Sequence, residues 1–126
     1  MNIHESAGDC LERVLMLRQK KDAVYSIDIV HELNFSKPSV SMAMKRLWEN
    51  GYIQMDVDGA ITLLPPGEEI ARRIYARHRL LTEFLIRLGV SPEHAASDAC
   101  RMEHDISGES YERIREATLQ KRREQG

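Results

Sequence analysis

Apolar residues recur along most of the chain at the three- and four-residue spacing of amphipathic helices, and short polar segments interrupt this pattern. The pattern predicts six helices, over residues 5–21, 27–33, 39–50, 68–88 and 92–106, and in a final stretch that Ser107 caps. In the second helix, which Ser26 is expected to cap, the side chains of Ile27, Val30 and Leu33 are expected to face inward. The polar tail, residues 120–126, is expected to fray.

A short hairpin is expected after the third helix. Gly51 is typical of the position just past a helix, and the segments 52–56 and 60–64 flank Asp58-Gly59, a pair favoured in tight hairpin turns. Two short helices joined by a tight turn and followed by such a hairpin are typical of a winged helix-turn-helix. The fold class is therefore mainly α: an N-terminal winged helix-turn-helix with a β-hairpin wing over residues 1–65, a Pro-Pro-Gly break, and a helical domain over residues 66–126.

The second helix of a helix-turn-helix places its N-terminal residues in the major groove of DNA, where short polar side chains reach base edges and phosphates. The candidate DNA-binding residues are Ser36, Lys37, Pro38, Ser39, Ser41, Met42 and Lys45. The wing is acidic and lacks arginine, so its contribution to DNA affinity is expected to be small. Two alternatives stay open: Ser36 only caps the helix while the other serines face solvent, or the winged helix binds a protein instead of DNA.

Composition limits the partners that this chain can have. The 126 residues carry a net charge of −2, so a DNA-binding basic surface must be local rather than spread over the protein. There are two cysteines, and no N-terminal apolar run resembles a signal peptide or a membrane span. We therefore expect a cytoplasmic protein without a membrane partner, whose thiols stay reduced and can bind metals.

A cluster of metal-ligating residue types lies in the fifth expected helix. Cys100, Glu103 and His104 are three and four residues apart, so all three project from one helix face. Thiolate, carboxylate and imidazole groups together form a metal-ligand set. The same residues could instead form a polar helix face with salt bridges to neighbours such as Arg101.

Three further candidates lie on other helices. Asp9 and Glu12 share a face of the first helix, and His78 lies in the middle of the long helix. Together with the cluster in the fifth helix, they could converge on one cation or on a closely spaced pair. Taken singly they are weak indicators, because carboxylates three residues apart usually form a solvated face and a lone histidine is often a surface residue or a buried, satisfied one.

Five stretches of the chain together resemble the DtxR/MntR family of metal-dependent repressors. They are residues 9–17 (DCLERVLML), 34–47 (NFSKPSVSMAMKRL), 63–67 (LLPPG), 77–84 (RHRLLTEF) and 99–107 (ACRMEHDIS). The helix-turn-helix, the histidine helix and the Cys-x-x-Glu-His cluster follow one another in the family's order and spacing. The resemblance implies a repressor that binds a divalent metal, dimerises through its helical domain and binds operator DNA.

The resemblance also implies which side chains bind the metal. Members that sense manganese have a glutamate where this chain has Cys100, and further ligands at positions matching Asp9, Glu12, His78, Glu103 and His104. Members that sense iron have cysteine at that place but methionine where this chain has Asp9. The chain thus mixes the ligands of two branches. Mn²⁺ or Fe²⁺ is the expected signal, and Zn²⁺ or Co²⁺ is also expected to bind.

Two further features indicate which branch of the family, manganese-sensing or iron-sensing, the chain resembles. The ancillary metal site of iron-sensing members is incomplete here, since Thr82 occupies its carboxylate position and Ala96 its second histidine position, although Glu83 and His94 are near by. The chain also lacks the SH3-like domain of the longer members, which predicts a two-domain architecture of the manganese type.

The expected function is a metal-dependent transcriptional repressor, a homodimer on double-stranded operator DNA that controls manganese or iron uptake. An enzyme is not expected, because the sequence indicates neither a substrate pocket nor a nucleophile. The alternative is a winged-helix regulator that responds to a small organic ligand or to oxidation of Cys10 or Cys100.

Overall fold

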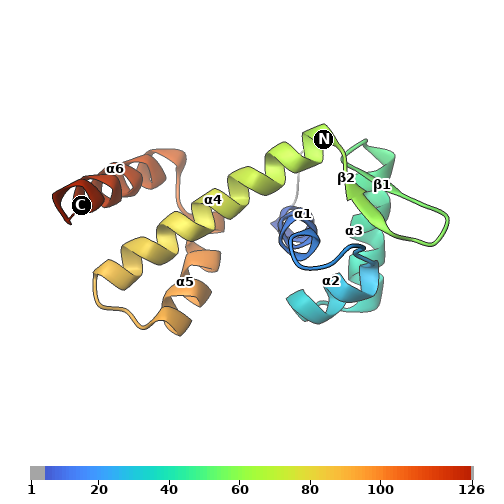
Figure 1. Cartoon of the computed structure of the whole chain (residues 1–126), viewed down its shortest axis with the longest axis horizontal. Helices are drawn as coiled ribbons and strands as arrows, with labels where there is room; N and C mark the ends of the chain where they lie inside the picture. The colour runs from blue at the N-terminus through green and yellow to red at the C-terminus, as the bar shows by residue number, and fades with distance from the viewer. Residues whose placement is uncertain (1–4, 126) are drawn as a thin grey trace. The chain divides into compact units, whose positions relative to one another are not determined.

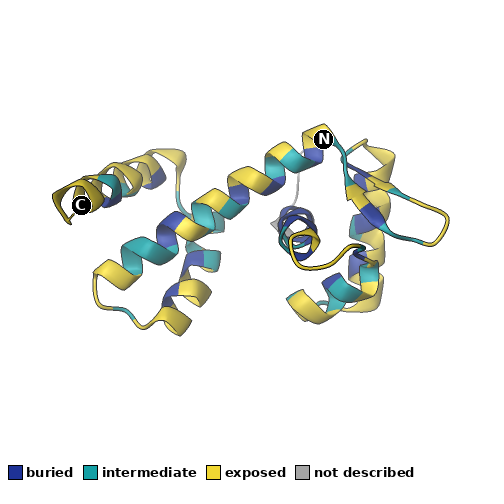
Figure 2. Ribbon diagram, in the orientation of Figure 1, coloured by how far each residue is buried: buried dark blue, intermediate teal, exposed yellow. Residues whose placement is uncertain are grey.

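The computed structural model describes residues 5–125 (Figure 1), and helices dominate it, which confirms the predicted fold class. Buried positions occur on every helix (Figure 2). The elements in chain order are α1 (Glu5–Arg18), α2 (Ser26–Leu33), α3 (Lys37–Glu49), β1 (Ile53–Met55), β2 (Ile61–Leu63), α4 (Pro65–Arg87), α5 (Pro92–Asp105) and α6 (Gly108–Gln125).

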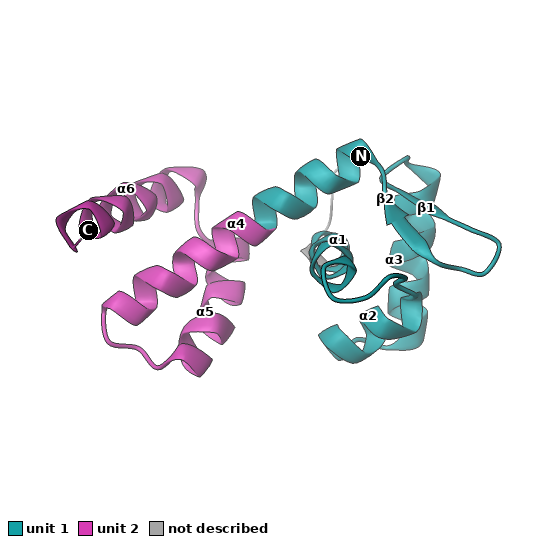
Figure 3. Ribbon diagram, in the orientation of Figure 1, with its two compact units in different colours: residues 1–74 teal, residues 75–126 magenta. Residues whose placement is uncertain are grey.

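The chain forms two compact units, residues 1–74 and residues 75–126, with the boundary inside α4 (Figure 3). The first unit contains the helix-turn-helix and the hairpin, and the second contains α5, α6 and the C-terminal part of α4. No helix within residues 5–125 combines the length and the apolar character that a membrane-crossing span needs.

The first unit is built on three mutually contacting helices, α1, α2 and α3, and on an antiparallel hairpin in which Ile53 pairs with Leu63. The backbone N–H of Ile61 donates a hydrogen bond to the carbonyl of Val24, 2.7 Å away, which ties the hairpin to the segment before α2. The core side chains, all almost fully buried, are Leu11, Val14, Val24, Ile29, Val40, Met44, Leu47, Ile53 and Ile61.

The inward face of α2 differs from the expectation. Ile27 is 42% exposed, whereas Ile29, which was not among the expected inward residues, is fully buried. Ser26 is the first helical residue rather than the cap; the cap is Tyr25, whose N–H donates to Oδ2 of Asp28, 2.9 Å away. An eight-residue helix is too short for apolar spacing alone to fix its orientation, so packing on α1 and α3 decides which face is buried.

Two helix boundaries differ by three residues from those that the sequence pattern predicted. The first helix ends at Arg18 rather than at residue 21, because the N–H groups of Lys20 and Lys21 turn back to the carbonyl of Leu17. The long helix begins at Pro65, three residues before the expected start. Prolines are compatible with a first helical turn, whose N–H groups have no partner within the helix, so the Pro-Pro pair starts α4 instead of preceding it.

The second unit has its own apolar core, formed by Leu80 and Leu81 of α4, Ala99 of α5 and Tyr111 of α6. The expected cap of α6 is confirmed, since the N–H of Ser110 donates to Oγ of Ser107, 3.1 Å away. This core holds α4, α5 and α6 together and so determines which side chains of α5 point toward α4.

The tail was expected to fray over residues 120–126, but α6 continues to Gln125, and Gly126 lies outside the described residues. Arg122 makes a bidentate pair with the carboxylate of Glu83 on α4, and Arg87 binds both that carboxylate and the side chain of Gln125. Hydrogen bonds from Arg122, followed by those from Arg87, lower the pKa of Glu83 to about 2. The carboxylate therefore stays ionised at neutral pH and keeps the end of α6 against α4.

Candidate metal centre and DNA-reading helix

The helix α5 presents the candidate ligand cluster at the edge of its buried face. Pro92 opens the helix after the N-cap Ser91, and the fully buried Ala95 and Ala99 face the core. Cys100 follows Ala99 directly, with Glu103 and His104 one turn further along, and all three are half-buried. The expected common face of these three residues therefore lies next to the core rather than on the solvent side.

The Glu103 side chain is 9% exposed, against 11% for His104, and its Oε2 lies 3.0 Å from Nδ1 of His104. This approach is not aligned as a hydrogen bond, and Oε2 has no hydrogen-bond partner among the described residues. A buried carboxylate oxygen in that state is unfavourable unless a cation compensates it. The burial argues against a merely solvated polar face, and the donor set fits a divalent transition metal.

Arg77, a residue that the sequence analysis did not single out, lies against this carboxylate. Its Nε is 3.7 Å from Oε1 of Glu103, and its guanidinium carbon is 4.4 Å from the centre of the Tyr111 ring. Stacking on an aromatic ring stabilises a cation. The second unit thus holds a fixed positive charge beside the candidate ligand.

The two candidate carboxylates of α1 are buried as well. Asp9 is 8% exposed and Glu12 is 1% exposed. The open alternative for this pair was a solvated helix face, and their burial disfavours it. Burying two carboxylates is costly unless they are paired or bind a metal, so they suit a ligand role.

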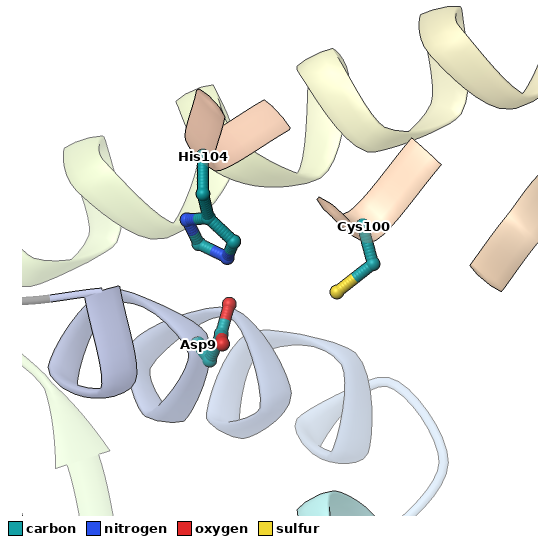
Figure 4. A group of neighbouring side chains, drawn as sticks. All are labelled: Asp9, Cys100 and His104. Atoms are coloured by element: carbon teal, nitrogen blue, oxygen red, sulfur yellow. The ribbon is translucent and has the colours of Figure 1, made fainter. Parts of the chain in front are cut away.

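Figure 4 shows three of the candidate ligands, Asp9 on α1 and Cys100 and His104 on α5. Each offers a different ligand atom: a carboxylate oxygen, a sulfur and an imidazole nitrogen. The candidate ligands of the chain thus include both hard oxygen and softer sulfur donors, as the mixture of branches in the sequence suggested.

Three residues at or near the ancillary positions, Thr82, Glu83 and His94, are engaged in other contacts. The hydroxyl of Thr82 donates to the carbonyl of His78, 2.7 Å away, and Glu83 is bound by two arginines. His94 is exposed, with its Nδ1 2.9 Å from Oγ of Ser91. His78 itself is half-buried in the middle of α4, as its position in the sequence suggested.

The thiol of Cys10 is in a different environment from that of Cys100. Cys10 is fully buried, and burial, followed by the charge of Asp9, raises its pKa to about 12. The thiolate is the reactive form of cysteine, so a buried thiol that stays protonated is chemically inert. This finding argues against Cys10 as the sensor in a redox-responsive regulator.

The seven candidate DNA-binding residues are all exposed on α3 or at its N-terminus. Ser36 is the N-cap, and its Oγ accepts from the N–H of Ser39, 3.2 Å away, so the capping alternative describes its contact within the protein. Lys45 has a side chain that is 76% exposed and only a weak contact with Glu49, 4.0 Å away. Asn34, in the left-handed conformation at φ 55°, makes the turn between α2 and α3.

A surface hollow of about 460 Å³ runs beside α3 and is lined by Ser41, Met44, Lys45, Trp48 and Met55, among others. Ser41 and Lys45 are themselves candidate DNA-binding residues. The hollow is thus part of the exposed face of α3 and gives no separate support for a small organic effector.

The wing is acidic for a structural reason. Oδ1 of Asp56 accepts hydrogen bonds from the N–H groups of Asp58 and Ala60, each 2.9 Å away, and Gly59 takes the positive φ of 89° that the turn requires. One of the two wing carboxylates therefore holds the turn together.

Comparison with known families accounts for nearly the whole chain. The sequence model of the iron dependent repressor N-terminal DNA binding domain matches residues 2–61, and that of the iron dependent repressor metal binding and dimerisation domain matches residues 65–123. These two matches follow each other in the order expected from the sequence.

Individual proteins similar to this chain are regulators of the same kind. The transcriptional regulator MntR of Salmonella typhimurium is 39% identical over 108 residues, which are 86% of this chain and 69% of the relative. The regulator MntR of Lysinibacillus sphaericus is 32% identical over 109 residues, covering 86% of this chain and 78% of the relative.

Solved structures show the same fold. A manganese-dependent transcriptional repressor in complex with manganese has a TM-score of 0.81 and 27% identity, covering 89% of this chain and 52% of that one. The crystal structure of T. acidophilum IdeR has a TM-score of 0.78 and 25% identity, covering 93% of this chain and 55% of that one. The chain thus spans about half the length of these solved chains. It belongs to the iron dependent repressor family, as the resemblance implied, and is a transcriptional regulator that responds to a divalent metal rather than an enzyme.

Proposed function

We propose that this chain represses manganese- or iron-uptake genes by binding their operator DNA as a homodimer when a divalent metal is bound. The observation that carries the proposal is the buried carboxylate of Glu103, whose Oε2 has no hydrogen-bond partner among residues 5–125, on the same helix face as a thiol and an imidazole. The membership of this chain in a family of metal-responsive regulators supports the same conclusion.

The proposed ligands come from three helices, α1, α4 and α5. Carboxylates, an imidazole from α4, and the cluster of α5 would together neutralise a dication and replace its hydration shell. The burial of both α1 carboxylates supports their inclusion. The six proposed ligands are Asp9, Glu12, His78, Cys100, Glu103 and His104.

The proposed DNA contacts lie at the N-terminal half of α3. Serine hydroxyls reach base edges or phosphates, lysines neutralise phosphates, and Pro38 or Met42 contacts a thymine methyl. Since the net charge of the chain is −2, the two lysines supply the local positive charge that DNA binding needs. The proposed contact residues are Ser36, Lys37, Pro38, Ser39, Ser41, Met42 and Lys45.

The proposed mechanism follows from the division of the ligands between two parts of the chain. When bound, the metal supplies a positive centre that these ligands share. Asp9 and Glu12 belong to the DNA-binding part, and the other ligands to the part that dimerises. Holding both sets at once restricts the relative motion of the two recognition helices in a dimer. The entropic cost of ordering the recognition helices is then met when the metal binds. DNA binding no longer carries this cost, so the affinity for the operator rises.

The functional boundary is proposed at residues 65 and 66, with a DNA-binding domain over residues 1–65 and a metal-binding and dimerisation domain over residues 66–126. The start of α4 at Pro65 and the family matches over 2–61 and 65–123 support it. A cytoplasmic location is proposed as well, because the operator DNA is found there.

Cys100 is proposed to set the metal preference. Replacing Cys100 by glutamate exchanges a soft donor for a hard one, which favours Mn²⁺ over Zn²⁺. We expect the ratio of the Mn²⁺ to the Zn²⁺ dissociation constant to fall by about tenfold or more. Competition titrations with a metal-sensitive dye measure this ratio, and Cys10→Ala, which removes the other thiol, is the control. An unchanged ratio in Cys100→Glu would exclude Cys100 from the ligand set.

Elemental analysis together with titration of the purified full chain tests the proposed function. We expect a stoichiometric amount of divalent metal to be retained after dialysis against MnCl₂ and to be removed by a chelator. The alternative regulator, which would answer to a small organic ligand or to oxidation of Cys100, predicts no stoichiometric uptake of metal. Absence of uptake with Mn²⁺, Fe²⁺, Co²⁺ and Zn²⁺ would overturn the proposal.

A further inference from the structure

We propose that Arg77 sets the metal affinity of this regulator, because its guanidinium takes the place of the metal beside Glu103 in the metal-free protein. The inference rests on the proposed function, in which Glu103 is a ligand. Arg77 is not itself a ligand, but it competes with the metal for the carboxylate of Glu103. All the groups concerned, Arg77, Glu103, His104 and Tyr111, lie within the second unit.

The geometry places a cation next to the carboxylate without satisfying it. Nε of Arg77 and Oε1 of Glu103 are 3.7 Å apart, which is too long for a hydrogen bond but close enough for a strong Coulomb attraction in a buried environment. Nε of Arg77 and Oε2 of Glu103 are both buried without a hydrogen-bond partner among the described residues. A structural ion pair would be expected to satisfy both groups.

Two contacts keep the guanidinium in this position. The side chain of Arg77 is only 22% exposed, and its guanidinium lies over the ring of Tyr111, itself part of the core between α4, α5 and α6. Arginine cannot lose its charge in a protein, so the positive charge beside Glu103 is permanent. It compensates the buried carboxylate when no metal is present.

The same charge acts against the metal. A dication that shares the Glu103 carboxylate experiences Coulomb repulsion from Arg77 and must displace its attraction to Oε1. Both effects raise the dissociation constant for metal. The regulator would therefore respond only above a metal concentration that this arginine helps to set, rather than to trace metal.

The test compares Arg77→Met with Arg79→Met in the full chain, using Mn²⁺ alone as the probe. Methionine keeps the unbranched stem and removes the charge. Arg79 is a matched control, since it lies on the same helix and also over a tyrosine ring, that of Tyr75 at 5.6 Å. Isothermal titration calorimetry should give a dissociation constant about tenfold lower for Arg77→Met than for the wild type, and an unchanged one for Arg79→Met.

Two further measurements separate the charge from a merely structural role. Arg77→Lys keeps the charge and should retain the wild-type dissociation constant. In chelator, Arg77→Met should melt at a lower temperature than the wild type, and saturating Mn²⁺ should remove the difference; a structural role would lower the melting temperature in both states. Should Arg77→Met not fold, Arg77→Gln is measured in the same way.

An equal or higher dissociation constant for a folded uncharged variant would overturn this inference while leaving the proposed function intact, provided that the wild type binds Mn²⁺. Failure of the wild type to bind Mn²⁺ or any other divalent metal would overturn the proposed function itself.

Discussion

Replacing Glu103 by alanine is expected to raise the metal concentration needed for operator binding by at least about 100-fold. Loss of a residue that only supports a ligand typically costs 10- to 100-fold in metal affinity, so loss of a central ligand costs at least as much. The fold should survive, because Glu103 lies at the edge of the α5 core face rather than within it. Fluorescence anisotropy of labelled DNA, titrated with Mn²⁺, measures the effect.

The matched control is Asp98→Ala, which removes an exposed carboxylate from the same helix. It should leave the metal dependence unchanged. Far-ultraviolet circular dichroism of both variants checks that the helices are intact. If Glu103→Ala kept the wild-type metal response, Glu103 would not be a ligand, and the ion pair with Arg77 would be only structural.

Replacing Gly67 by alanine is expected to destabilise the first unit by roughly 3 kcal/mol or more. A Cβ atom at this position would lie 2.1 Å from the carbonyl oxygen of Tyr52 and 3.0 Å from its carbonyl carbon, both backbone atoms. That same oxygen accepts the hydrogen bond from the N–H of Leu64, 3.0 Å away, so moving it also disturbs the end of the hairpin. Only glycine lets α4 approach the chain this closely.

Urea unfolding followed by the fluorescence of Trp48, the single tryptophan of the chain, reports on the first unit. Gly108→Ala is the control, because nothing lies within 4 Å of a Cβ placed there; it should change stability by no more than about 0.5 kcal/mol by circular dichroism. An unfolding midpoint for Gly67→Ala equal to that of the wild type would show that the approach of α4 to Tyr52 is looser than described.

Much of the fold was predictable because its signals are local. The helix α3, the Asp58-Gly59 turn and the Ser107 cap are set by residues close together in the sequence, and each was predicted from the sequence. Two of the errors occurred where distant contacts decide. Ile29 rather than Ile27 faces the core of α2, and the tail of α6 is held by ion pairs with α4.

The candidate site, too, was predictable only in part from local signals in the sequence. Helical spacing was enough to place Cys100, Glu103 and His104 on one face, whereas the resemblance to a family was needed to join residues from α1 and α4 to them. Neither could have found Arg77, because its contact with Glu103 depends on how α4 and α5 pack. A basic residue directly before a candidate ligand histidine was the only available signal.

Metal binding is expected to control operator binding, which is measured by titrating DNA with the full chain at fixed ionic strength. Duplex fragments are first selected by the protein from a random pool, separately with Mn²⁺ and with chelator. We expect the affinity for the selected operator to rise by about 100-fold with Mn²⁺ and to fall back on chelation. Equal affinity in Mn²⁺ and in chelator would show that the metal does not control operator binding.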